Sequence, residues 1–324
     1  MHIEVHTSDR SMFKRCRQSW DFASNLRMNL EPNRPIEPLW MGTGIHLALA
    51  TYYEPSTPRD PEHMVKTFHQ YVQDWVDHNE PDDTEWADRL LAQGTGMLEN
   101  YGLWAPRHDD FEVVAVEIPF ELEVPGMPGT TYAGRMDGLV KDSKGRLWIL
   151  EHKTAAQFFE NEEWLALDDQ CGSYLWVLHA LGYDCEGVIY NTLKKKVPSD
   201  LRPLVNGGFS VAKNQDTTFE IAKGQLREHY GKIPRQYWEF LDFLKTKPNA
   251  FFKRTYVRRN HHEMGVITKE LREEVLDMVN NPAIYRSPSR LNCSNCQFIA
   301  PCISKWEGSD YQFLLDTNYR KRGD

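Results

Sequence analysis

The sequence predicts an α/β fold with a central mixed β-sheet flanked by helices. Residues 60–80 and 84–104 carry apolar side chains at helical spacing, whereas residues 111–124 are rich in strand-forming valine and isoleucine. Further along, a helix expected over 159–182 is followed by a strand expected over 185–193. Strands that alternate with helices in this way are typical of a sheet covered by helices.

Composition is that of an ordinary globular protein. The chain has 324 residues, of which 40% are hydrophobic and 26% are charged, enough for one large domain or two of ordinary size. No stretch approaches the roughly 20 apolar residues of a membrane span, and residues 1–16 contain no apolar signal segment. We therefore expect an intracellular protein that makes no membrane contact.

The net charge of −9 has the wrong sign for a protein whose whole surface binds nucleic acid, but it allows a local basic groove. Basic residues cluster at 10–17, at 194–196 and at 253–259. The last cluster is interleaved with aromatic residues that could stack on bases. A solvated surface is the commoner meaning of such a cluster. The candidate nucleic-acid contacts are Lys194, Lys195 and Arg254.

The N-terminal part of the chain is predicted to be largely helical. Ser8 or Asp9 can cap a first helix over residues 8–28, and a proline-rich loop follows over 32–38. The two long helical segments then form a helical lobe, which we place at residues 55–108.

Between the loop and the lobe, Gly42 and Gly44 allow a close approach of the backbone. His46 is expected in the first turn of a helix that continues to Tyr53. A lone histidine is more often a satisfied core residue than a ligand. The role of His46 therefore depends on what the fold brings near it.

Residues 134–154 lie in the predicted sheet core, 109–215, and predict a β-hairpin with charged residues at its open end. The first strand runs into a polar turn with a glycine, and the second begins as a short apolar run. If the turn is centred on Ser143 and Lys144, counting outward along both strands pairs Asp137 with Leu150. Asp137 then lies beside Glu151, roughly 5 Å away across the ladder.

Side chains alternate along a strand, so Glu151 and Lys153 share one face and His152 points the other way. Two carboxylates this close repel each other unless a positive charge lies between them, and a divalent metal is the usual solution. Lys153 would then position a water or stabilise charge on a phosphate. A surface hairpin with a solvated Asp137 is the commoner arrangement, but charges at the end of a buried strand need partners. Glu117, on the preceding strand, is expected to point away.

After the hairpin, Gln170 and Tyr174 lie four residues apart on the expected helix and so share a face. They lie either beside the charged site or in a buried pair that caps a packed helix. An irregular stretch with the basic cluster at 253–259 is expected after residue 246, and residues 320–324 are expected to fray. A short strand is expected over residues 209–212, and helices are expected over 217–246 and 268–280.

Three cysteines in the C-terminal region 285–304 have the spacing C-x2-C-x5-C. Cysteines this close inside a cell are typical metal or cluster ligands, and such sites usually have four. Cys171 and Cys185 lie in apolar segments, which leaves the cysteine near the N-terminus as the natural fourth ligand. The expected ligands are Cys16, Cys293, Cys296 and Cys302.

The order of these motifs resembles that of the RecB-type nucleases of the PD-(D/E)XK superfamily. The motifs are Gly-x-Gly-x-His at 42–46, Gly-Arg-x-Asp at 134–137, Glu-x-Lys at 151–153 and Gln-x3-Tyr at 170–174. The framing cysteines resemble the iron–sulfur branch of that group, which includes Cas4-like exonucleases and phage relatives. The resemblance covers residues 8–302. Met136 stands where the family name implies a proline, at a position that varies in this superfamily.

The resemblance implies a role for each residue. Asp137, Glu151 and His46 would hold Mg²⁺ or Mn²⁺, with the backbone carbonyl of His152 as a further ligand. Lys153 would orient or activate the attacking water. The four cysteines would bind a structural [4Fe–4S] cluster, with Zn²⁺ as the alternative at that site. Two helix residues would contact the DNA strand or brace the site, namely Gln170 and Tyr174.

The implied activity is that of a metal-dependent DNA exonuclease, organised as a single nuclease domain over residues 1–324. Single-stranded or end-containing DNA is the expected substrate, in recombination, repair or CRISPR spacer acquisition. A recombination or CRISPR adaptation protein is an expected partner, in the cytoplasm of a bacterium or of a phage-infected host. The alternative is a non-cleaving DNA-binding or assembly subunit. That alternative predicts loss of Asp137, Glu151 or Lys153, and all three are present.

Overall fold

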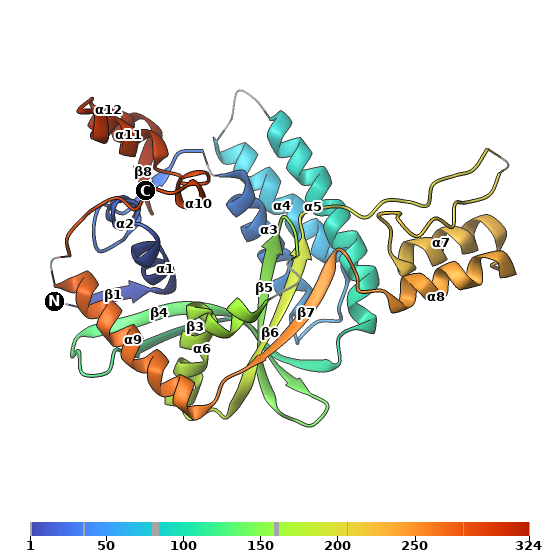
Figure 1. Ribbon diagram of the computed structural model, residues 1–324, viewed down its shortest axis with the longest axis horizontal. Helices are drawn as coiled ribbons and strands as arrows, with labels where there is room; N and C mark the ends of the chain where they lie inside the picture. The colour runs from blue at the N-terminus through green and yellow to red at the C-terminus, as the bar shows by residue number, and fades with distance from the viewer. Residues whose placement is uncertain are drawn as a thin grey trace.

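A computed structural model describes residues 2–34, 36–79, 84–158, 162–205, 207–280 and 282–323. At its centre lies a mixed six-stranded sheet in the order β1–β4–β5–β6–β7, with β3 paired along β4 (Figure 1). The β1–β4 and β5–β6 pairs are parallel and the others antiparallel. The expected α/β fold is confirmed. The strands are β1 (Ile3–His6), β3 (Phe111–Glu123), β4 (Thr130–Asp142), β5 (Leu147–Ala155), β6 (Cys185–Lys194) and β7 (Phe252–Arg258).

One stretch of the β4 edge faces a gap in the sheet. On one side, β3 pairs along nearly the whole length of β4. On the other side, the pairing with β1 ends at Ala133 and the pairing with β5 begins at Gly138. Residues 134–137 therefore have no strand partner on that side among the described residues. Asp137 lies at the end of this gap.

Helices cover both faces of the sheet. One group packs against the face that carries Trp148 and Leu150, and a second group packs against the face that carries Ile149. This alternation along β5 is the normal two-residue period of a strand. The first group comprises α3 (Glu37–Tyr53), α4 (Pro61–Asn79) and α5 (Glu85–Trp104). The second comprises α1 (Thr7–Arg15), α6 (Asp169–Ala180) and α9 (His261–Val279).

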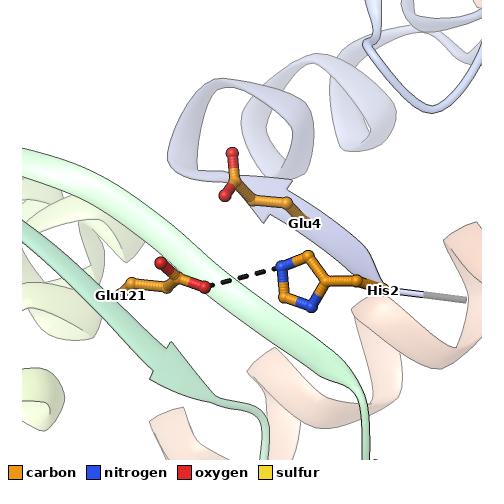
Figure 2. Close-up of side chains that lie close together, drawn as sticks. All are labelled: His2, Glu4 and Glu121. Carbon is orange, nitrogen blue, oxygen red and sulfur yellow. Dashed lines mark ion pairs between the residues drawn. The ribbon is translucent and has the colours of Figure 1, made fainter.

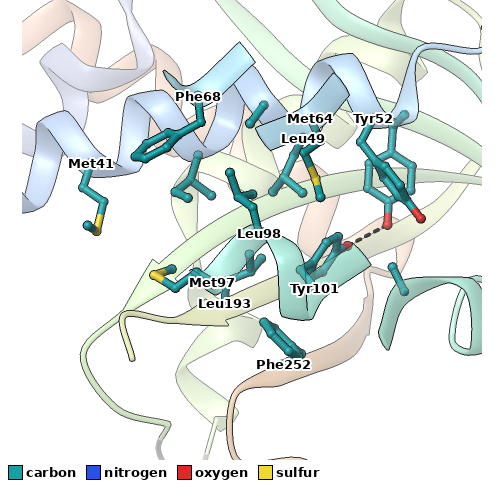
Figure 3. Packing of buried hydrophobic residues seen from close by; sticks show 14 of the residues in the cluster. Met41, Leu49, Tyr52, Met64, Phe68, Met97, Leu98, Tyr101, Leu193 and Phe252 are labelled. Carbon is teal, nitrogen blue, oxygen red and sulfur yellow. Dashed lines mark hydrogen bonds between the residues drawn. The ribbon is translucent and has the colours of Figure 1, made fainter. Parts of the chain in front are cut away.

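The first helical group packs closely because two glycines make room for Phe68 of α4. A side-chain carbon on Gly94 of α5 would lie 2.2 Å from the Phe68 ring, and one on Gly44 of α3 would lie 2.8 Å from it. Figure 3 shows Phe68 in the buried cluster that α3, α4, α5 and the strands share. The close approach expected at Gly44 is confirmed, and its partners are core aromatic rings.

The N-terminal helix expected over residues 8–28 is wrong in its extent. The strand β1 comes first, and α1 and α2 (Arg17–Ala23) follow as separate helices. Cys16 divides them with an extended φ of −164°. His6 rather than Ser8 or Asp9 lies at the N-cap of α1.

The proline-rich loop is shorter than expected, because β2 (Leu30–Pro32) enters it and α3 begins at Glu37. His46 therefore lies in the middle of α3 rather than in a first turn. The helix expected over 159–182 is also shorter. Its start at Phe159 lies outside the described residues, and the short 3₁₀ helix η2 (Glu163–Leu167) precedes α6.

The region after β6 differs most from expectation. The residues expected to be irregular contain β7, which pairs with β6 and extends the sheet beyond residues 109–215. The strand expected over 209–212 is only an isolated bridge between Pro203 and Phe209. The helix expected over 217–246 is interrupted after Gly231, whose φ is 67°. It is replaced by α7 (Phe219–Tyr230), η3 (Arg235–Tyr237) and α8 (Trp238–Thr246), and α9 begins at His261 rather than at 268.

The C-terminal segment returns to the N-terminal one (Figure 1). β8 (Tyr319–Lys321) pairs with β2, and Arg320 forms an ion pair with Glu31 at 2.9 Å. The expected fraying is therefore wrong for residues 320 and 321, while Asp324 lies outside the described residues. No helix in the described part of the chain is long and apolar enough to cross a membrane. The remaining elements are η1 (Ala105–Arg107), α10 (Arg290–Cys293), α11 (Ile299–Glu307) and α12 (Tyr311–Asn318).

Candidate active site

The hairpin β4–β5 aligns Asp137 with Glu151. Its turn is one residue longer than expected, because Gly145 takes a left-handed φ of 75°. Gly138 therefore pairs with Leu150, and the expected pairing of Asp137 with Leu150 is wrong by one residue. The ladder ends at Gly138, so the two carboxylates lie where the strands begin to separate.

Asp137 is held by two other parts of the chain. Its Oδ2 accepts a hydrogen bond from the backbone N–H of His152 at 2.7 Å, and Nδ1 of His46 lies 3.3 Å from its Oδ1. Burial opposes ionisation of Asp137, but the hydrogen bond from His46 and the charge of that ring outweigh it. The pKa of Asp137 therefore lies below its ordinary value. Helix α3 thus brings His46 to the carboxylate, where the family resemblance had placed it.

Glu151 is the most unusual group in the site. Its side chain is 2% exposed, and its Oε2 has no hydrogen-bond partner in the described part of the chain. Burial raises the pKa of Glu151 to about 7, opposed by Lys153 and assisted by the charge of Asp137. A buried carboxylate oxygen without a donor is costly unless a cation or a proton satisfies it.

Lys153 connects Glu151 to helix α6. Its Nζ lies 2.8 Å from Glu151 Oε1 and donates to Gln170 Oε1 at 2.6 Å. The amide nitrogen of Gln170 in turn donates to the hydroxyl of Tyr174 at 3.0 Å. Burial opposes the charge of Lys153, but Glu151 outweighs it and raises the pKa of Lys153. Lys153 is therefore an ammonium group fixed at one oxygen of Glu151.

These donors fit a hard divalent cation. Two carboxylates, a backbone carbonyl and one imidazole are the kind of set that binds Mg²⁺ or Mn²⁺. The unpartnered oxygen of Glu151 supplies the physical reason for a cation at this place.

A family model described as the PD-(D/E)XK nuclease superfamily matches residues 7–303. The chain belongs to this superfamily. Membership implies metal-dependent cleavage of nucleic acid, and PD-(D/E)XK nucleases usually use Mg²⁺ or Mn²⁺. The match also suggests DNA as a substrate.

Two other comparisons add little to the PD-(D/E)XK assignment. No curated protein matches the chain. The solved structure titled "Crystal structure of SSO0001" aligns at 13% identity over 81% of this chain and 84% of that chain, with a TM-score of 0.31. A TM-score this low carries no argument.

Behind the PD-(D/E)XK site, the His152 ring lies in a buried polar network. It stacks on Tyr53 with centroids 5.7 Å apart, and its Nδ1 lies 2.8 Å from the amide nitrogen of Asn191. Burial lowers the pKa of His152 to about 3, so the ring is neutral. Asn191 was not expected as a site neighbour. The only signal in the sequence is a polar amide directly after the apolar residues 188–190.

Arg254 belongs to the same network rather than to the surface. Its side chain is 7% exposed and pairs with Asp109 at 2.6 Å, and it also donates to Asn191 at 3.0 Å. The guanidinium is therefore engaged inside the fold. This burial argues against the DNA contact that we expected from Arg254.

The two candidate lysines lie at the same end of the sheet as the active site. Lys194 aligns with Ala155 on the neighbouring strand, two residues beyond Lys153. Lys195 is partly buried and donates to the carbonyl of Pro38 at 2.7 Å. Burial lowers the pKa of Lys195. Lys194 is only partly buried, in contrast to the buried Arg254.

The four framing cysteines line one cavity of ≈ 120 Å³ between the N-terminal and C-terminal segments. All four are free thiols. Burial raises the pKa of Cys302, and the neighbouring thiols add to the shift. The apolar rings of Phe22 and Phe298 also line the cavity. The fold therefore gathers the expected cysteines, although they are far apart in sequence.

A separate surface group consists of His2, Glu4 and Glu121 (Figure 2). Among the described residues it is the one group of three His, Cys, Asp or Glu side chains whose ligand atoms all lie within 4.8 Å of one another. The ligand atoms of the active site and of the cysteine site are therefore farther apart than this. His2 is exposed and pairs with Glu121 at 3.5 Å. Exposed pairs of this kind contribute little to stability, and we assign no site here.

Proposed function

We propose that this protein is a metal-dependent DNA exonuclease that hydrolyses phosphodiester bonds from strand ends. The observation that carries the proposal is the buried, unpartnered Oε2 of Glu151 beside the ionised Asp137. A metal-dependent phosphodiesterase needs carboxylate ligands for its cation, and the superfamily supplies the reaction class. The RecB-like order of the motifs supports the narrower assignment to an exonuclease.

The proposed cation ligands are Asp137, Glu151, His46 and the backbone carbonyl of His152. A divalent cation held there would lower the pKa of a bound water and offset the charge of the phosphate. Lys153 would orient that water or stabilise the charge on the phosphate, because its ammonium is fixed by Glu151 and Gln170. Tyr174 would keep Gln170 in place through its hydroxyl.

The biological setting remains part of the proposal. We infer a single nuclease domain over residues 1–324, with a helical lobe at 55–108 and a sheet core that includes 109–215. The protein would act in the cytoplasm on single-stranded or end-containing DNA, with a recombination or CRISPR adaptation protein as a partner. The Cas4-like arrangement of the motifs supports this setting.

The exonuclease activity predicts a strict requirement for free DNA ends. With Mn²⁺ present, we expect the wild type to degrade linear single- or double-stranded DNA and to leave a covalently closed circle of the same sequence intact. Gel analysis of end-labelled and end-blocked substrates measures this difference. Nicking of the circle at the rate of linear degradation would make the enzyme an endonuclease. Absence of any cleavage would favour the alternative of a non-cleaving DNA-binding or assembly subunit.

We further propose that the cysteines bind a structural [4Fe–4S] cluster, with region 285–304 and Cys16 as the cluster region. A cavity of ≈ 120 Å³ is several times the roughly 30 Å³ that one water occupies in the liquid, which suits a group of several atoms better than one zinc ion. A cluster there would join chain segments that are distant in sequence and so stabilise the fold.

Anaerobic purification tests the cluster directly. We expect a brown protein with broad charge-transfer absorbance in the visible region and about four irons per chain. Cys302→Ser should lower the iron content, whereas Cys185→Ser, in a buried strand outside the cavity, should not. A colourless protein with one zinc would replace the cluster by the zinc alternative and leave the nuclease proposal unchanged.

A further inference from the structure

A groove of ≈ 1270 Å³ lies beside the active site. Gln170 and Tyr174 both line it, and Gln170 also accepts a hydrogen bond from Lys153 at 2.6 Å. From there the groove follows the gap in the sheet, where Gly134 and Arg135 of β4 line it opposite the first residues of α1. A substrate strand in this groove would be continuous with the site of cleavage.

Two large apolar side chains form one edge of the groove. Trp164 is 53% exposed and Leu167 is 83% exposed, and both lie on η2 immediately before α6. We call these two residues the lip. An exposed indole next to an exposed leucine at the edge of a groove gives a ligand an apolar surface to pack on.

The lip is exposed although its backbone is anchored. Leu165 between its two residues is buried, and Arg259 donates to the Leu165 carbonyl at 2.9 Å. Just before η2, Glu162 pairs with Lys253 at 2.7 Å and accepts from Thr255 at 2.8 Å. Strand β7 therefore fixes the turn that presents the lip.

Three charged groups that line the groove are paired within the protein. Arg135 pairs with Glu117 at 2.9 Å, and Arg10 pairs with Glu274 at 2.7 Å. Asp169, also in the groove, is paired with Lys14. The groove therefore offers a nucleic acid little net positive charge for its phosphates. It offers aromatic and apolar surface, which binds unpaired bases by stacking.

We propose that the lip is a stacking surface for unpaired bases of a single-stranded DNA substrate entering the groove. The proposal deepens the proposed function and rests on it, because the same strand would reach the cation site past Gln170. Bases in a duplex are stacked and paired with each other, so the lip would select single-stranded ends. Trp164 is the specificity-determining residue in this arrangement.

Binding measured without divalent metal separates this proposal from cleavage. In EDTA, we expect Trp164→Ala to bind a fluorescein-labelled single-stranded oligonucleotide roughly 10-fold more weakly than the wild type does, and Trp164→Phe to retain most of the affinity. The matched control is Trp238→Ala, because Trp238 is 54% exposed and lies on α8 outside the groove. The control should bind as the wild type does.

A second probe identifies the bases as the bound group. An abasic oligonucleotide of the same length has no bases to stack on the lip. The wild type and Trp164→Ala should therefore bind this abasic oligonucleotide equally weakly. Equal binding of the normal oligonucleotide by the wild type and Trp164→Ala would overturn the proposal, as would undetectable binding by the wild type. Cleavage by the wild type in Mn²⁺ is a separate result, so failure of the nuclease proposal is distinguishable from failure of the lip.

Discussion

Replacing Glu151 by glutamine is expected to reduce DNA cleavage on the order of 10³-fold, because it removes a proposed cation ligand worth several kcal/mol in the transition state. The substitution keeps the shape of the side chain and its contact with Lys153. Initial rates of cleavage of an end-labelled oligonucleotide in Mn²⁺ measure the effect. The matched control is Glu117→Gln, because Glu117 is a carboxylate of the neighbouring strand paired with Arg135. A Glu151→Gln rate close to that of the wild type would remove Glu151 from the site.

The same variant should remove a pH dependence of stability. The pKa of Glu151 is raised to about 7 in the fold, above its ordinary value of 4.5. The folded metal-free protein therefore binds more protons than the unfolded chain between these values, and its stability falls as pH rises through 7. The shift corresponds to roughly 3 kcal/mol. Urea unfolding in EDTA at pH 5 and pH 8 should show this loss in the wild type and a smaller one in Glu151→Gln.

Replacing Arg254 by methionine is expected to destabilise the fold by about 3 kcal/mol. Removing one partner of a buried ion pair leaves the other charge uncompensated, which typically costs 3–5 kcal/mol. Asp109 is 1% exposed but would keep its pairing with Arg59 at 2.6 Å and a hydrogen bond from the Tyr53 hydroxyl at 3.0 Å. We therefore expect a cost at the lower end of that range. Urea unfolding at pH 7 measures the change in the free energy of unfolding.

The matched control for Arg254 lies on the same strand. Arg258 pairs with Glu186 at 2.7 Å but is 58% exposed, so Arg258→Met should cost at most about 1 kcal/mol. If Arg254 bound DNA as its sequence context suggested, Arg254→Met would weaken DNA binding and leave stability nearly unchanged. That result would contradict the buried network around His152.

The central hairpin was predictable because the residues that determine it are close together in the sequence. Asp137, Glu151 and Lys153 lie within one turn-connected pair of strands, and their alternation needs no knowledge of the rest of the fold. The register was wrong by one residue because the left-handed Gly145 lengthens the turn. His46 could be placed only through the family resemblance, since its contact with Asp137 spans 91 positions in the sequence.

The errors lie where distant partners decide the structure. β7 is rich in charged residues and becomes a strand because it pairs with β6, which propensity alone does not reveal. Arg254 belongs to a basic cluster in the sequence, but its side chain is buried because it pairs with Asp109, which is 145 positions away. The groove beside Gln170 likewise arises from a gap between β1 and β5 that no local pattern indicates.

Binding of Mn²⁺ tests the central claim most directly, because the proposed cation site can be measured without DNA. Titration of wild type, Asp137→Asn and Glu151→Gln, followed by the electron paramagnetic resonance signal of free Mn²⁺, gives the affinity of each. The proposed ligands predict a Mn²⁺ site in the wild type that either substitution weakens by at least about 10-fold. Equal affinity in all three proteins would contradict the assignment of Asp137 and Glu151 as ligands.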